Sequence, residues 1–129
     1  MSSEKKPVIL IIDDSSTNLV LLDAILQEEG YIIETAFSAK EALKIVDQRI
    51  PDLILLDLLM PQVSGFDFLT KLKSNPTTNK IPVVVVSAVG TKENIENCYN
   101  LGVVDFINKP IDIPVFLKKV VDYLKLSVQ

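Results

Sequence analysis

Four strand-length apolar runs constrain the fold of this 129-residue chain, because each leads directly into polar side chains. The runs are Val8–Ile12, Leu53–Leu56, Val83–Val86 and Val104–Ile107. In the same order, the residues that follow them are Asp13 with Asp14, Asp57, Ser87, and Asn108 with Lys109. Parallel strands end along one edge of a sheet, so we expect these residues in one crevice. Three carboxylates, a hydroxyl and an ammonium at one place can hold a divalent cation and accept a phosphoryl group.

Segments with helical spacing of apolar residues separate the apolar runs, so strands and helices alternate along the chain. We expect strands over residues 8–12, 31–36, 51–57, 81–87 and 103–107, and helices over 16–29, 38–50, 64–75, 91–101 and 112–126. The inward faces are expected to include Ala39, Ala42, Leu43, Val46 and Ile50 in the second helix and Phe116, Leu117, Val120, Val121 and Leu124 in the fifth.

Strands that are apolar throughout, such as Val83–Val86, are buried on both faces and require helices on both sides of the sheet. Right-handed crossovers then give a flavodoxin-like α/β fold, a doubly wound three-layer sandwich with five parallel strands and five helices. The second and fifth strands are the weakest and suit the edges, which gives the order 2-1-3-4-5. We expect residues 1–129 to form one domain, with a core over about 7–126 and no effector domain.

Composition excludes several kinds of chemistry. The chain has no histidine and a single cysteine, which rules out Ser–His–Asp and Cys–His nucleophiles, His-based zinc sites and an internal disulfide. A net charge of −4 without a basic stripe argues against direct nucleic-acid binding. We see no signal peptide and no apolar stretch of membrane-spanning length, so we expect a cytoplasmic location without membrane contact.

The three expected neighbours Asp13, Asp14 and Asp57 repel one another when ionised. Two unit charges ~4 Å apart cost about 4 kcal/mol at an effective dielectric constant near 20, which a bound cation would offset. Oxygen ligands without Cys or His select Mg²⁺, Ca²⁺ or Mn²⁺, and Mg²⁺ is the default in the cytosol. Either acidic motif alone is more typical of a turn or a helix cap. Their occurrence at the ends of several strands favours a site.

The chain carries an ordered set of motifs: Asp13-Asp14, Asp57 with Met60-Pro61 and Gly65, Ser87-Ala88, and Phe106 with Lys109-Pro110. Taken together and in this order, they resemble the CheY-like receiver domain of bacterial two-component response regulators. The resemblance implies a phosphorelay signalling protein in which Asp57 accepts a phosphoryl group from a histidine kinase or a histidine phosphotransfer protein. It implies a regulator that catalyses only its own phosphorylation and dephosphorylation.

The resemblance also assigns roles to the other site residues. It implies that Asp14 and Asp57 bind Mg²⁺ directly, that Asp13 acts mainly through water, and that Leu59 contributes its main-chain carbonyl. Lys109 and Ser87 would contact the phosphoryl group. Ser87 and Phe106 would then form a conformational switch, and the Lys109–Pro110 peptide bond is expected to be cis.

Three surfaces bear on partners. The first helix has two apolar residues, Val20 and Leu21, on its less buried side. In the family that the chain resembles, this helix contacts the helical hairpin of the kinase. The fourth helix carries Asn94, Asn97 and Asn100 on one side, which suits either an adjustable output face or a plain solvated one; Ile95, Cys98, Tyr99 and Leu101 remain to anchor its other side. The resemblance allows a phosphorylation-dependent dimer through the fourth helix, fifth strand and fifth helix.

The sequence does not define the output partner or effector. The alternative to a phosphoacceptor function is a receiver-like docking module that acts without phosphorylation.

Overall fold

In the described part of the chain, five parallel strands form one sheet in the order β2-β1-β3-β4-β5, as the sequence predicts. The computed structural model describes residues 6–58, 65–88 and 90–127. The strands are β1 (Val8–Ile12), β2 (Ile32–Ala36), β3 (Leu53–Leu56), β4 (Val83–Ser87) and β5 (Asp105–Asn108). Every neighbouring pair is parallel, so the carboxyl ends of all five strands lie at the same edge. The two strands placed at the edges from their weak patterns, β2 and β5, are the edge strands.

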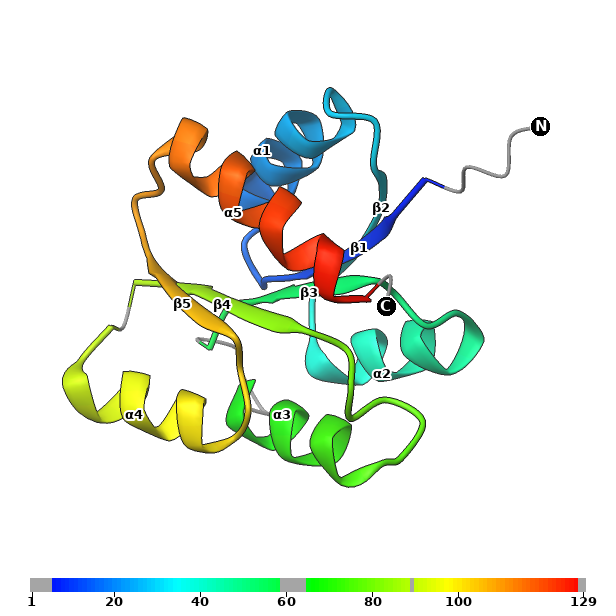
Figure 1. Ribbon diagram of the computed structural model, residues 1–129, viewed down its shortest axis with the longest axis vertical. Coiled ribbons are helices and arrows are strands. Elements are labelled where there is room, and N and C mark those ends of the chain that lie inside the picture. Colours follow the sequence, from blue (N-terminus) through cyan, green and yellow to red (C-terminus); the bar gives the residue numbers. More distant parts are fainter. Residues whose placement is uncertain (1–5, 59–64, 89, 128–129) are drawn as a thin grey trace.

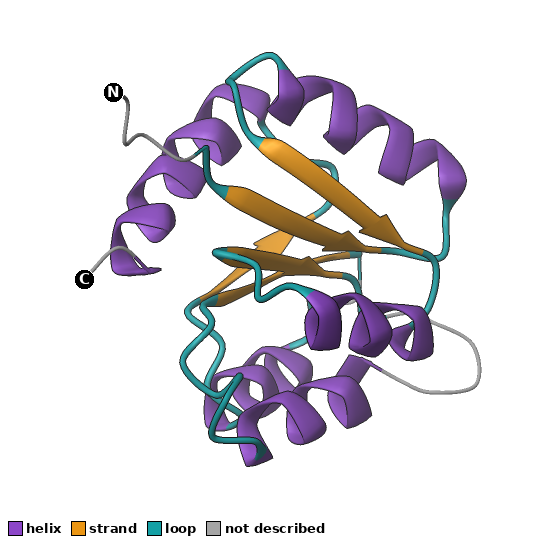
Figure 2. Ribbon diagram, turned by 90° about the vertical axis from the view of Figure 1, so that its right-hand side faces the viewer, coloured by secondary structure: helices purple, strands orange, loops and turns teal. Residues whose placement is uncertain are grey.

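Five helices in the described ranges cover both faces of the sheet. They are α1 (Ser16–Gln27), α2 (Ala39–Gln48), α3 (Gly65–Ser74), α4 (Lys92–Asn100) and α5 (Ile113–Ser127). Figure 1 shows α1 and α5 above the sheet and α2, α3 and α4 below it, and the turned view in Figure 2 shows the same three layers. None of the helices in the described ranges combines the length and apolar character needed to cross a bilayer.

Two apolar clusters fill the spaces between the layers. Successive strand residues point to opposite faces, so Ile9 and Ile11 pack toward α1 and α5 while Leu10 and Ile12 pack toward the other three helices. All residues of β3 and β4 are buried. This burial on both faces confirms the three-layer arrangement expected from the uninterrupted apolar runs.

Local sequence signals set most of the helix ends. The side chains of Ser15, Ser38 and Thr91 accept hydrogen bonds from main-chain N–H groups in the first turns of α1, α2 and α4. Asp112 serves α5 in the same way, through the N–H of Val115 at 3.2 Å. Gly30 follows α1 with a φ of 90°, a left-handed conformation that glycine adopts without strain.

Three residues expected to pack inward are exposed instead. Ile50 lies beyond the last residue of α2, because the chain is already extended at Arg49, and it is 45% exposed. Val121 is 40% exposed, since the buried face of α5 is the narrower row of Phe116, Val120 and Leu124. Tyr99 is 47% exposed, so it is not an apolar anchor of α4.

Candidate functional site

The main chain places Asp13 and Asp57 side by side at the carboxyl edge of the sheet. Each residue continues its strand's hydrogen-bonding ladder by one step: the Asp13 N–H donates to the Ala36 carbonyl at 3.1 Å, and the Asp57 N–H to the Ile12 carbonyl at 2.9 Å. Because β1 and β3 are adjacent, their two carboxylates emerge together. Both residues are nearly inaccessible, at 2% and 7% exposure.

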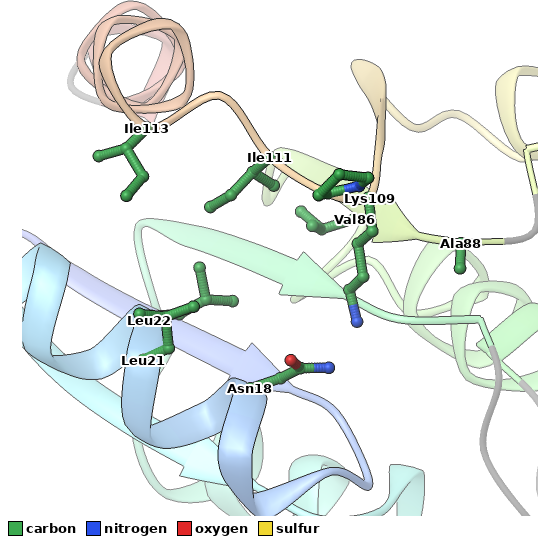
Figure 3. A pocket seen from close by; sticks show the side chains of 9 residues that line it. Asn18, Leu21, Leu22, Val86, Ala88, Lys109, Ile111 and Ile113 are labelled. Carbon is green, nitrogen blue, oxygen red and sulfur yellow. The ribbon is translucent and has the colours of Figure 1, made fainter.

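Lys109 reaches both carboxylates from the end of β5. Its Nζ lies 2.9 Å from Asp13 Oδ2 and 3.3 Å from Asp57 Oδ2. Figure 3 shows this side chain extending from the end of its strand toward α1. Burial lowers the pKa of Lys109, but the hydrogen bonds and charges of Asp13 and Asp57 outweigh burial and raise the pKa above its usual value. Lys109 is therefore a protonated side chain that forms ion pairs with both carboxylates.

Ser87 contacts the remaining oxygen of Asp57. Its hydroxyl donates a hydrogen bond of 2.9 Å to Asp57 Oδ1, and its side chain is fully buried at the end of β4. The Lys109 N–H donates to the Ser87 carbonyl at 3.0 Å, which ties the ends of β4 and β5 together. The two oxygens of Asp57 are thus bonded by groups from two different strands.

Asp13 is held by three donors besides its place in the sheet. Oδ1 accepts the Ser15 N–H at 2.9 Å, and Oδ2 accepts both Lys109 and the Asn18 side-chain amide, the latter at 3.3 Å. Sequence analysis missed Asn18. The only available signal was its position one turn into a helix that begins just after the acidic pair.

The carboxylates of Asp13, Asp14 and Asp57 offer oxygens within 4.8 Å of one another, close enough to hold one metal ion. Asp14 is exposed, and no hydrogen bond or ion pair involves it within the described ranges. Lys109 offsets part of the charge of the three carboxylates and leaves the cluster with excess negative charge. Leu59, the other residue expected to contribute a metal ligand, lies outside the described residues, as do Met60 and Pro61.

The neighbouring segments fit closely around this edge. Phe106 is 9% exposed and packs in the same apolar cluster as Cys98 and Val103. The Lys109–Pro110 peptide bond is cis, the geometry that the resemblance led us to expect.

At Gly65, the first residue of α3, an added Cβ would lie 2.9 Å from Leu58 Cα and 3.1 Å from the Asp57 carbonyl oxygen. A residue without a side chain is needed there for α3 to begin so close to the acidic cluster.

The fold and this edge define a CheY-like α/β signalling domain, and comparison with known proteins agrees. Residues 9–121 match the family described as response regulator receiver domain, and the chain belongs to this family. It is 33% identical over 116 residues to the polar-differentiation response regulator DivK of Brucella ovis, covering 90% of this chain and 94% of DivK. A CheY-like receiver domain protein from Methanospirillum hungatei superposes with a TM-score of 0.89 at 28% identity, covering 95% of this chain and 97% of the other.

Some relatives are much longer than this chain. It is 41% identical over 104 residues to the response regulator PleD of Caulobacter vibrioides, an alignment that covers 81% of this chain but 23% of PleD. The chain therefore spans about a quarter of the length of such curated relatives. What is shared with them is the receiver domain of two-component systems.

Proposed function

We propose that this receiver domain signals by accepting a phosphoryl group on Asp57 in a Mg²⁺-dependent reaction. The observation that carries the proposal is the arrangement around the Asp57 carboxylate, with Ser87 on one oxygen and Lys109 on the other. A carboxylate oxygen would attack the phosphorus of a phosphohistidine, forming a P–O bond as the P–N bond breaks and the imidazole departs. Lys109 would bind a phosphoryl oxygen and offset the charge that collects on the oxygens in the transition state.

The acidic cluster fits a hard divalent cation such as Mg²⁺, with Mn²⁺ as a substitute. When bound, the ion supplies charge neutralisation next to the acceptor carboxylate. Asp14 is the most available direct ligand, together with Asp57. Both oxygens of Asp13 are already bonded to Ser15, Asn18 and Lys109, which supports a contact through water. The Leu59 carbonyl is proposed as a further ligand.

The same residues support a two-state switch. A phosphoryl group on Asp57 would draw the Ser87 hydroxyl away from its present bond to Asp57 Oδ1. We propose that Phe106 then moves into the space that Ser87 leaves. A change from 1% to 99% of the active packing requires about 5.5 kcal/mol of preferential stabilisation.

Acetyl phosphate tests the phosphoacceptor role without a kinase. Incubating the protein with acetyl phosphate and Mg²⁺ should add the mass of one PO₃ group, and peptide mapping should locate it on Asp57. Chelation of the metal is the control and should suppress the addition. An unchanged mass with Mg²⁺ present would favour the docking module that acts without phosphorylation.

An apolar groove beside Lys109 is the proposed docking place for a histidine kinase or a histidine phosphotransfer protein. The groove has a volume of about 460 Å³ and lies between α1 and the segment before α5. Figure 3 shows Leu21 and Leu22 on one side and Ile111 and Ile113 on the other. Val20 extends the apolar surface of α1 and is 69% exposed. A donor helix laid against this surface would bring its phosphohistidine toward the acidic edge.

Leu21→Asp or Val20→Asp should slow phosphotransfer from the kinase by about tenfold, because a charge there opposes burial of the apolar contact. Transfer from acetyl phosphate should be unchanged, since neither side chain belongs to the acidic cluster. Ile50→Asp is a matched control, because Ile50 is similarly exposed but lies beyond the end of α2. Equal slowing with both donors would contradict docking at α1.

The remaining assignments are also proposals. We take residues 1–129 as a single receiver domain that works in the cytoplasm and catalyses only its own phosphorylation and dephosphorylation. Its output would pass to a partner or effector domain, and phosphorylation would favour a dimer through α4, β5 and α5. We propose no direct contact with nucleic acid or membrane.

A further inference from the structure

A polar cluster centred on Asp105 joins α4, β5 and α5, away from the acidic edge. We call Tyr99, Asp105, Lys119 and Tyr123 the Asp105 hub. Asp105 Oδ1 accepts the Tyr99 hydroxyl from α4 at 3.3 Å and the Phe106 N–H at 2.8 Å. Oδ2 accepts Lys119 Nζ and the Tyr123 hydroxyl, both from α5, at 3.0 and 2.7 Å. One carboxylate thus binds donors from three elements.

The hub favours an ionised Asp105. Burial raises the pKa of Asp105, but the hydrogen bonds from Tyr123, Lys119 and the Phe106 N–H, with the charge of Lys119, outweigh burial and lower the pKa. Burial, together with the hydrogen bond to Asp105, raises the pKa of Tyr123 to about 12, so this phenol remains a donor. The two short bonds from α5 fix the carboxylate, while the bond to Tyr99 is the longest of the four.

Helix α4 buries little of its surface. Of its residues, all of which the structure describes, only Cys98 is fully buried. Ile95 is partly buried against the same apolar cluster. Three asparagines lower its intrinsic helix stability. A helix with so little buried surface shifts at low cost, so the hydrogen bond from Tyr99 to Asp105 bears on its position.

Asp105 also joins the switch residue to this helix. The oxygen that accepts the Tyr99 hydroxyl accepts the N–H of Phe106 as well, so a movement of the main chain at Phe106 changes the geometry of both bonds. On the opposite side of the strand, the Phe106 ring packs in one cluster with Cys98 of α4. The Phe106 ring therefore shares an apolar cluster with α4, and the Phe106 main chain is linked to Tyr99 of α4 by way of Asp105.

We propose that Asp105 is a positioning residue of the switch, whose carboxylate, fixed by α5, couples the state of β5 at Phe106 to helix α4 through Tyr99. The inference rests on the proposed function, because it needs a phosphorylation-dependent change at Phe106. It predicts that the hub transmits that change to α4, in addition to holding the helix in the resting state.

Tyr99→Phe is the sharpest test, because it removes one hydroxyl and keeps the ring. Amide hydrogen exchange in α4 (Lys92–Asn100) should accelerate by about fivefold in the resting protein, the size expected for loss of one partly exposed hydrogen bond. Exchange in β1 and β3 should be unchanged. Asp105→Ala, which removes the acceptor altogether, should give at least the same effect. The matched controls are Tyr31→Phe, a tyrosine outside the hub, and Lys118→Met, an exposed lysine of α5 that pairs with Asp122.

The coupling itself is read by adding Mg²⁺ and beryllofluoride, which stands in for the phosphoryl group. In the wild type and both controls, the addition should change exchange both near Ser87 and in α4. In Tyr99→Phe, the change near Ser87 should persist while the change in α4 falls to less than about half, as expected when the link from α4 to Asp105 is lost. A full response in α4 would overturn the proposal and leave the hub a purely structural feature.

The outcomes separate this inference from the proposed function. No response to beryllofluoride anywhere in the wild type would contradict the proposed function, and the coupling would fall with it. A wild-type response that Tyr99→Phe leaves intact, or resting exchange in α4 that is the same in all variants, would overturn the role of Asp105 alone.

Discussion

Asp57→Asn should lower the rate of phosphorylation by acetyl phosphate by at least about 1000-fold, because a neutral amide cannot replace the attacking carboxylate. The substitution keeps the shape of the side chain and an oxygen that can accept the Ser87 hydroxyl. Lys109 keeps its 2.9 Å contact with Asp13. Intact-mass measurement over a time course checks the result.

The control for this substitution is Asp47→Asn, which removes a carboxylate from the exposed surface of α2 and should label like the wild type. Far-ultraviolet circular dichroism should show that both variants are folded. Label retained on the Asp57→Asn protein and mapped to Asp13 or Asp14 would show that a neighbouring carboxylate is the acceptor. Undiminished labelling at any position would contradict the assignment of Asp57.

Lys109→Met should reduce the free energy of unfolding by about 3 kcal/mol without Mg²⁺, because it leaves two nearly buried carboxylates without their cation. Phosphorylation by acetyl phosphate should fall by about 100-fold, the usual cost of removing one charge-stabilising donor. Urea unfolding and the mass assay measure the two effects. Lys118→Met is again the control, since its side chain is 78% exposed and should be nearly neutral.

Two further measurements bear on the role of Lys109. Adding Asp57→Asn to Lys109→Met should restore part of the lost stability, because it removes one of the uncompensated charges. The pKa of Lys109 is raised above its usual value of 10.5, so its stabilising effect is fully present below that pH and is lost as pH rises through the higher folded-state pKa. The stability difference should be constant across the neutral range and shrink only in strongly alkaline solution. A difference in the free energy of unfolding that vanished near neutral pH would contradict the proposed ion pairs of Lys109.

The strand order and the proximity of site residues that are distant in the sequence could both be predicted, because both depend on the spacing of apolar and polar residues along the chain. Uninterrupted apolar runs such as Val83–Val86 require a sheet covered on both faces, and parallel strands share one carboxyl edge. That reasoning placed Asp13, Asp57, Ser87 and Lys109 together before any distance was known. The distances of 2.9 to 3.3 Å among them agree with it.

Side-chain contacts that leave no periodic pattern in the sequence could not be predicted from it. Asn18 donates a hydrogen bond to Asp13 from the first turn of α1, a position that no sequence pattern marks. Tyr99 was expected to pack inward as an apolar residue, whereas its hydroxyl bonds Asp105 at the surface. Ile50 and Val121 fit an apolar spacing but fall outside the buried faces, because spacing does not say where a helix ends or how wide its contact is.

The separations between the bonded site residues along the chain have a consequence for how the protein is made and degraded. Asp57 and Ser87 are 30 residues apart, Asp57 and Lys109 are 52, and Asp13 and Lys109 are 96. Lys109 follows the edge strand β5, the last strand of the sheet to be synthesised. A nascent or proteolytically clipped chain that ends before β5 would carry the proposed acceptor Asp57 without its cationic partner. Under the proposed function, a chain could then be phosphorylated efficiently only once its sheet is complete. Incomplete chains would not respond to the phosphoryl donor.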